Sequence, residues 1–328
     1  MGQHRVAVTW AVLGGLLLAL FAGTVLILNA TLYSASGFAG SYLAALSRHD
    51  VAAAVELAGP PSASGGAKAG RDLLDPRALG ELRSIRLVSD VQQGDVHLVR
   101  YSYVMADGAR KATGATTFRV ERDGVRMGLF ANWRFAASPL GTLTITPRHD
   151  AGFTANGLQL RSAAPDVGTR QLALTPGLYV LGHQSDYFTA EPVLARLSRA
   201  GADAEASVDV QANSVFVKQV QEGLNDQLKK CATQKVLLPT GCPFGKEIGD
   251  RIEGTPAWSI VHNPEVTIGP GPTPGTWQVP QTTGTAHLTV KVRSIFDGSV
   301  TTLDEDVPFT VGYTIGFTSH GRLVITGH

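Results

Sequence analysis

The two cysteines of the chain, Cys231 and Cys242, lie in the stretch KKCATQKVLLPTGCPFG (229–245) and are the first candidates for chemistry. A structural zinc site needs about four ligands, commonly as two closely spaced Cys or His pairs, and neither cysteine has a histidine beside it. Thioredoxin-like redox chemistry needs Cys-x-x-Cys at a helix N-terminus, whereas Cys231 ends a helical pattern. The pair therefore predicts a disulfide in an oxidising compartment, with no metal and no cofactor.

His97 is the second candidate, because it lies in a strand-like stretch with Asp95 close by and Asp107 further along. A histidine beside a carboxylate can act as a general acid or base where a substrate reaches it. The same face of the strand carries residues typical of a core, namely Val99, Tyr101 and Tyr103. A structural role for His97 therefore stays open beside the catalytic one.

The other residues of chemical interest favour structural roles. His287 alternates with Lys291 and Arg293 on a strand face that we expect to point toward solvent. Several aromatic residues could line a carbohydrate or peptide groove, but such side chains more often fill cores. These residues are Trp133, Trp258, Trp277, Tyr101 and Tyr103. The motifs of zinc proteases, α/β-hydrolases and P-loop proteins do not occur, so we expect a protein that is not an enzyme.

The N-terminal segment predicts where these residues lie relative to a membrane. No Lys, Arg, Asp or Glu occurs between Arg5 and Arg48, and the apolar run 6–28 can cross a hydrocarbon core of about 30 Å. We expect the bilayer to be a partner through residues 6–28, with the N-terminus cytoplasmic and the rest extracytoplasmic, because Arg5 favours the inner side. The small residues of LYSASG (32–37) leave cleavage after the helix as an alternative.

Composition limits the classes of partner. The chain has 328 residues, of which 17% are charged, and its net charge is +1. A nearly neutral chain lacks the basic surface that binds phosphate backbones, so we expect no nucleic-acid partner. The length is enough for two or three folded domains beyond the anchor.

Periodicity predicts the elements of the first part of the chain. Helical spacing covers 36–58, with a break at SRHD and Asp50 as the N-cap of a second helix. After the Gly/Pro/Ser-rich loop 59–70 we expect a further helical piece over 75–85 and strands over 95–135. Asp-Gly pairs favour tight hairpin turns, which we expect at Asp107-Gly108 and Asp123-Gly124.

The rest of the chain predicts short strands first and then a helix with longer strands. Residues 139–211 read as strands separated by Gly, Pro and Asn, with at most a helical turn in EPVLARLSRAG (191–201). A helix begins at Asn213 or Ser214, and two alternating strands joined by Asp297-Gly298 follow it. The helix carries one apolar stripe, made of Val217, Val220, Leu224, Leu228 and Cys231.

These patterns predict an α+β fold with an N-terminal transmembrane helix. Helix-on-antiparallel-sheet domains are expected on both sides of a small all-β module. The predicted parts are the anchor, an α+β domain, a small β-sandwich-like module, and a second α+β domain that holds the disulfide. Their expected ranges are 1–30, 31–138, 139–211 and 212–328.

Four short segments carry a resemblance to known families. SYLAALSRHDVAAAVELAG (41–59) resembles the opening of nuclear-transport-factor-like, cone-shaped α+β domains, the fold of ketosteroid isomerase. This resemblance implies a cone-like form for the first α+β domain and a cone- or cystatin-like form for the second. FTANG (153–157) and LTPGLYV (174–180) resemble small β domains of Gram-positive envelope proteins associated with teicoplanin resistance. With CPFG (242–245) after a helix, the chain is similar to uncharacterised single-pass proteins of actinobacteria. The resemblance implies an architecture and a location, and it implies no activity.

Two functions follow as hypotheses. The first is a membrane-anchored, extracytoplasmic, non-enzymatic binding, sensing or scaffold protein of a bacterial cell envelope, with a cell-wall component or another envelope protein as partner. The alternative is a ketosteroid-isomerase-like enzyme that uses a cavity in the first α+β domain, with His97 and either Asp95 or Asp107 as its acid and base.

Overall fold

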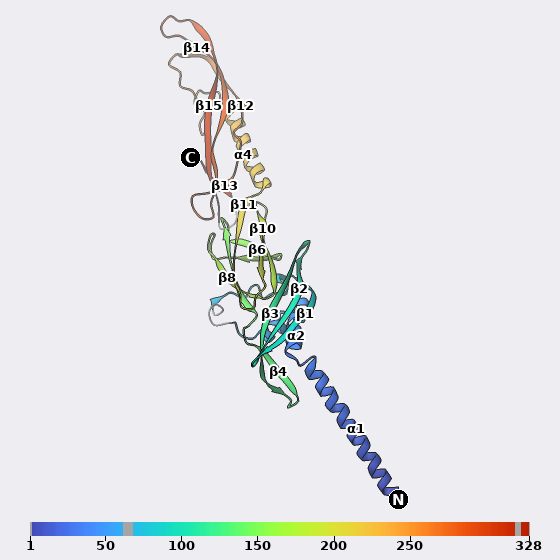
Figure 1. Ribbon diagram of the computed structural model, residues 1–328. Coiled ribbons are helices and arrows are strands. Elements are labelled where there is room, and N and C mark those ends of the chain that lie inside the picture. The colour runs from blue at the N-terminus through green and yellow to red at the C-terminus, as the bar shows by residue number, and fades with distance from the viewer. Residues whose placement is uncertain (1, 62–67, 319–322, 328) are drawn as a thin grey trace.

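The protein is an elongated mixed α+β molecule that consists mostly of sheet (Figure 1). The computed structural model describes residues 2–61, 68–318 and 323–327, so the centre of the expected loop 59–70 lies outside the described residues. An N-terminal helix projects from one end, and three sheets follow one another toward the other end (Figure 1). The α+β class and the N-terminal apolar helix predicted from the sequence are both present.

Helix α1 (Gly2–Ala30) projects from the folded part of the chain, which it contacts at its C-terminal end (Figure 1). Its window Leu13–Ala30 has a mean hydropathy of 2.1 and is not buried within the protein. By length and composition this helix can cross a membrane, as the apolar run 6–28 predicted.

The first sheet follows α1 and is covered on one face by helices. The chain turns from α1 into α2 (Ala35–Ser47), α3 (Val51–Ala58) and the short 3-10 helix η2 (Pro76–Ala78). As predicted, Asp50 caps α3 by accepting a hydrogen bond from the backbone N–H of Ala53. The antiparallel strands lie in chain order: β1 (Glu81–Gln93), β2 (Val96–Asp107), β3 (Arg110–Arg126) and β4 (Phe130–Phe135).

Two local expectations for this part of the chain are wrong. The helical piece over 75–85 is limited to η2, because Glu81 pairs with Ala106 and the chain continues as strand β1. Asp123-Gly124 does not form the turn between β3 and β4. It lies at a register shift between Arg122 and Val125, which is a bulge, and β3 then continues to Arg126.

The second sheet has seven strands in the order β7-β6-β9-β10-β11-β5-β8. Only β11 and β5 pair in parallel among its described strands. The helical turn considered for 191–201 is absent, since most of that segment belongs to strand β10. The strands are β5 (Leu140–Arg148), β6 (Gly152–Ala155), β7 (Leu158–Arg161), β8 (Thr169–Leu174), β9 (Gly177–Gln184), β10 (Phe188–Leu197) and β11 (Asp203–Ala212).

The third sheet lies farthest from α1 and packs against helix α4 (Ser214–Ala232). Asn213 caps this helix, and the predicted stripe is buried with one change, since Phe216 is fully buried and Val217 only partly. The main strand order is β12-β14-β15-β16, in chain order like the first sheet, and β13 pairs with β14. The strands are β12 (Arg251–His262), β13 (Gly269–Pro270), β14 (Trp277–Arg293), β15 (Val300–Phe317) and β16 (Leu323–Gly327).

The buried hydrophobic side chains form two clusters, although the described strands form three sheets. One cluster lies between α2 and the first sheet and reaches Leu140, Leu174 and Leu178 of the second sheet. The other joins the second sheet to α4 and the third sheet. The division of the chain into domains at residues 138 and 211 therefore stays a prediction, while the core continues across both positions.

Candidate functional site

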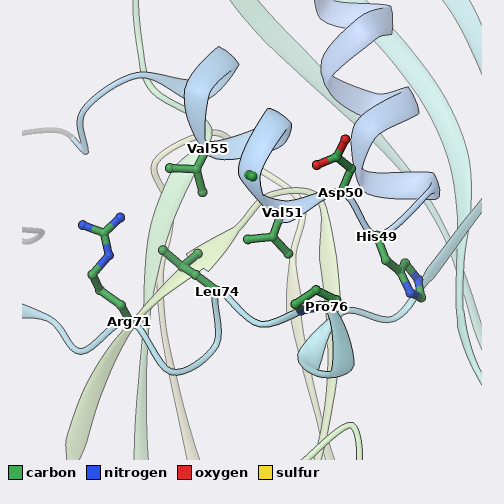
Figure 2. A pocket seen from close by; sticks show the side chains of 8 residues that line it. His49, Asp50, Val51, Val55, Arg71, Leu74 and Pro76 are labelled. Atoms are coloured by element: carbon green, nitrogen blue, oxygen red, sulfur yellow. The ribbon is translucent and has the colours of Figure 1, made fainter.

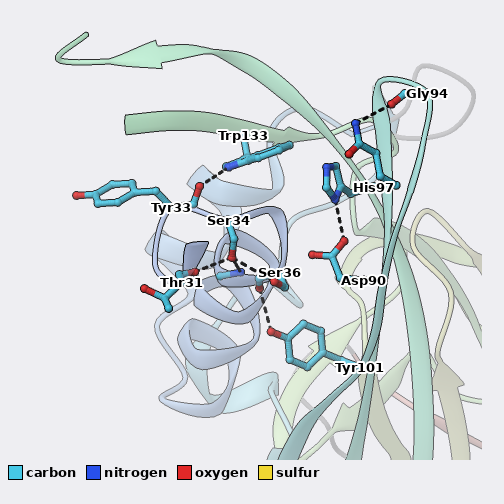
Figure 3. Close-up of polar contacts among 11 residues, drawn as sticks. Thr31, Tyr33, Ser34, Ser36, Asp90, Gly94, His97, Tyr101 and Trp133 are labelled. Atoms are coloured by element: carbon cyan, nitrogen blue, oxygen red, sulfur yellow. Dashed lines mark hydrogen bonds and ion pairs between the residues drawn. The ribbon is translucent and has the colours of Figure 1, made fainter. Parts of the chain in front are cut away.

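His97 lies at the rim of the first sheet, where α1 joins the folded part (Figure 3). Its Nδ1 lies 2.8 Å from Oδ1 of Asp90, which belongs to the neighbouring strand β1. Its ring meets the ring of Trp133 edge-on at 5.1 Å, and Trp133 Nε1 donates a 2.7 Å hydrogen bond to the carbonyl of Tyr33. The imidazole is therefore held in one orientation by a carboxylate and an indole.

The structure gives His97 a partner other than the two carboxylates considered from the sequence. Asp95 lines the same surface hollow of about 580 Å³ as His97, but Asp90 makes the hydrogen bond. Asp107 lies at the opposite end of β2, in a separate hollow with His49 and Arg77. Neither expected pairing, His97 with Asp95 or His97 with Asp107, is made.

The space between α2 and the first sheet is filled by aromatic side chains. Tyr42 and Phe118 are fully buried, and both rings contact each other edge-on, with Phe135 beside them. Tyr101, 8% exposed, donates its hydroxyl to the carbonyl of Ser36. The hollow beside His97 therefore opens at the rim of the sheet and does not reach into the covered interior.

A second hollow of about 530 Å³ lies where α2 meets α3, and sequence reasoning did not single it out (Figure 2). Its floor is apolar, with Val51, Val55 and Leu74, and the side chains of His49 and Arg71 stand at its two sides. Asp50 also lines the hollow, so its ionisable side chains are of both signs. The sequence held no signal for it, because the floor comes from residues on both sides of the loop 59–70.

His287 lies in a charged cluster on the exposed side of the third sheet. Its Nδ1 is 2.7 Å from Asp306 and its Nε2 is 2.8 Å from Asp304, which also accepts from the hydroxyl of Thr289. The hydrogen bond to Asp306, then that to Asp304, raises the pKa of His287. The sequence predicts that His287 faces solvent, and the structure places it half-buried. Its two carboxylate partners come from β15 and were not predicted.

The aromatic residues considered for a groove mostly fill cores. Trp277 is 1% exposed, Trp258 7% and Tyr103 2%. Trp277 stacks on Phe188 of the second sheet with ring centres 4.6 Å apart. These rings therefore hold the sheets together rather than form a ligand groove.

Cys231 and Cys242 form a disulfide, with Cα atoms 5.8 Å apart. It ties the end of α4 to the CPFG segment, where Phe244 is 4% exposed and contacts the rings of Trp258 and Phe309. The loop after α4 is thus held against the third sheet.

Within the part of the chain that the structure describes, no group of three or more His, Cys, Asp or Glu side chains could hold a metal ion.

Comparison of the chain with family models, curated proteins and solved structures returns no match.

Proposed function

We propose that the chain is a single-pass, membrane-anchored, extracytoplasmic protein of a bacterial cell envelope that acts by binding or scaffolding and not by catalysis. Helix α1 is the anchor, and the third sheet is held away from the membrane to meet a cell-wall component or another envelope protein. The disulfide supports an oxidising location outside the cytoplasm. The resemblance of FTANG and LTPGLYV to Gram-positive envelope domains supports the same location.

The observation that carries this proposal is the series of contacts, most of them buried, that links α2 to the third sheet. Tyr42 of α2 donates a 2.8 Å hydrogen bond to the carbonyl of Thr175, between strands β8 and β9 of the second sheet, and both residues are fully buried. Thr116 of β3 donates to the carbonyl of Ser198 at 2.6 Å. Because its sheets are joined in this way, the rod keeps its two ends in a fixed position relative to each other. This suits display of a binding surface better than enclosure of a substrate.

The joint between the second and third sheets is equally tight. Five aromatic rings from both sheets and α4 pack on one another: Tyr187, Phe188, Phe216, Trp277 and Phe317. Asn213 adds polar contacts, since its side-chain amide donates to the carbonyl of Asp186 at 3.0 Å while its oxygen caps α4. Hinge motion at this joint would separate buried rings, so we expect the two sheets to move together.

The experiment tests location and binding separately. Full-length protein in its host membranes should resist extraction at alkaline pH, and a membrane-impermeant maleimide should label Cys231 and Cys242 in intact cells only after reduction. Labelling without reductant would contradict the disulfide, and absence of labelling even after reduction would contradict the exported location. The full chain in lipid nanodiscs should then sediment with wall fragments or crosslink to one envelope protein, with empty nanodiscs as control. Failure of both binding assays would refute the binding role.

A second candidate function rests on the Asp90–His97 pair. A carboxylate that orients an imidazole beside an open hollow is an arrangement used in proton transfer. An enzyme of the ketosteroid-isomerase type would lose turnover of a β,γ-unsaturated ketosteroid in His97→Asn and keep it in His262→Gln, which changes an exposed histidine of the third sheet. Absence of turnover in the unaltered protein would exclude this ketosteroid activity.

A further inference from the structure

The hairpin between β3 and β4 extends past the rest of the first sheet and ends in apolar residues. The last pairs of the two strands are Val125 with Ala131 and Arg126 with Phe130. Near the turn, Met127 is 81% exposed, Val125 52% and Leu129 46%. Turns between strands usually carry polar residues that face water. An apolar turn at the end of a projecting hairpin indicates a surface that meets something other than water.

The hairpin is bound to the last turn of α1. The side chain of Asn29 donates to the carbonyl of Leu129 at 2.9 Å and accepts from the backbone N–H of Ala131 at 3.0 Å. One amide thus pairs with the edge of β4 as a neighbouring strand would. Tyr33, just after α1, stacks its ring on that of Phe130 at 4.3 Å.

The exposure pattern of α1 agrees with this contact. Val25 is half-buried, and so are Leu28 and Asn29, which lie three and four residues after it on the same side of the helix. Leu26 and Ile27, on other faces, are 70% and 65% exposed. The half-buried stripe is the side of α1 against which β4 lies.

The hairpin points along α1 toward its N-terminus (Figure 1). Trp133 is bound beside Tyr33 and Ala131 beside Asn29, so earlier residues of β4 lie at earlier positions of the helix. At about 3.3 Å per strand residue, the turn lies roughly 7–10 Å beyond the level of Asn29. Asn29 is itself inside the apolar window Leu13–Ala30. Interfacial helices bury their apolar faces to a similar depth, about 5–10 Å.

We propose that residues 125–129 enter the boundary between head groups and acyl chains of the bilayer that α1 spans. The proposal rests on the proposed anchoring by α1 and adds a second point of membrane contact. With two contacts held together by Asn29, the first sheet cannot rotate freely about the end of the helix. The rod is then fixed in its tilt relative to the membrane surface.

The occupant of this surface is lipid because the hairpin lies against the segment that is itself apolar enough to be in lipid. Arg126 gives the segment 125–129 one positive charge, which a long side chain can keep at the level of the head groups. The neighbouring charge on β4 is balanced and does not call for an acidic partner. Arg134 of β4 forms an ion pair with Glu121 at 2.6 Å and lies 3.8 Å from Asp123. Insertion is therefore expected into zwitterionic phosphatidylcholine as well as into anionic lipid.

A single introduced thiol tests the proposal in the full-length chain. The described cysteines are both in the disulfide, so Met127→Cys gives one site for an environment-sensitive NBD label. In phosphatidylcholine nanodiscs we expect blue-shifted NBD emission that lipids brominated near the head group quench. The matched control is Phe296→Cys, which is 94% exposed in the turn between β14 and β15 at the far end of the rod. It should show neither effect.

A third label separates this proposal from the anchoring on which it rests. Leu17→Cys lies within the apolar window of α1 and should be quenched by lipids brominated deep in the acyl chain. If the label at 17 is in lipid while that at 127 is in water, hairpin insertion is refuted and the anchor stands. If both labels are in water, the anchoring and the insertion fall together. Substitution Met127→Asp, read with a label at Leu129→Cys, should move that label from lipid to water.

Discussion

The hydroxyl of Tyr42 in α2 donates a 2.8 Å hydrogen bond to the backbone carbonyl of Thr175, a residue 133 positions later in the chain. Both residues are fully buried, and burial holds the pKa of Tyr42 well above its usual range. Thr175 in turn donates its own hydroxyl to the carbonyl of Pro139 at 2.6 Å. Helix α2 is thereby bonded to the start of the second sheet through groups that have no access to water.

Substitution Tyr42→Phe tests how much this contact contributes. It keeps the ring packed on Phe118 but leaves a buried carbonyl without its donor, which costs about 1–3 kcal/mol. Chemical denaturation should show that loss. Tyr33→Phe is the control, since its ring remains stacked on Phe130. An equal, small effect of both substitutions would mean that Tyr42 acts only through its ring.

The disulfide should stabilise the third sheet and α4 more than the first sheet. Closing a loop with a sequence separation of 11 is worth about 3 kcal/mol in the chain-entropy model. Reduction, or the double substitution of Cys231 and Cys242 by Ala, should lower the melting temperature. Hydrogen exchange should quicken first around Phe244. Unchanged exchange there after reduction would show that the CPFG segment holds without the bond.

Part of this architecture could be predicted from local sequence patterns. Alternation placed Leu288 and Val290 on the buried face of β14, and capping residues placed the starts of α3 and α4. These features depend on neighbours a few residues away, which sequence periodicity records.

Other features depend on strand register and on contacts between sheets, which local patterns do not record. Asp90 lies opposite Val99 in the register of β1 and β2, and so reaches His97 two residues away on the neighbouring strand. The Asp123-Gly124 dipeptide has the composition of a turn, but β3 pairs with β4 on both sides of it. After this bulge β3 continues to Arg126, where the turn into β4 begins.

The cluster around His287 should make stability depend on pH. Because the folded protein raises the pKa of His287, its contribution is complete below the ordinary histidine pKa and is lost as pH rises through the raised value. Asp304, whose pKa is lowered first by Thr289 and then by His287, loses its contribution as pH falls through its own lowered value. His287→Gln should therefore lower the melting temperature most in mildly acidic buffer and least at high pH. A melting-temperature series across pH checks this, with exposed His262→Gln as control. A deficit that stayed constant with pH would contradict it.

Asn156, in the turn between β6 and β7, bonds the segment just before β1 to the second sheet. Three substitutions of Asn156 can separate the contributions of its individual contacts to stability. Its amide nitrogen donates to the carbonyls of Ala78 and Leu178, and its oxygen accepts from the N–H of Val180. Its backbone has a φ of 48°, which asparagine and glycine tolerate better than alanine. Asn156→Asp keeps the acceptor but replaces the donor by an oxygen facing two carbonyls, so it should destabilise strongly at neutral pH and less in acid, where the protonated carboxyl can donate. Asn156→Gly loses the three bonds without backbone strain, and Asn156→Ala adds that strain, about 1 kcal/mol more. In denaturant unfolding, the Ala variant should have a lower free energy of unfolding than the Gly variant, and only the Asp variant should depend on pH. Equal free energies of unfolding for Gly and Ala would show that the backbone relaxes and that the hydrogen bonds alone hold this junction.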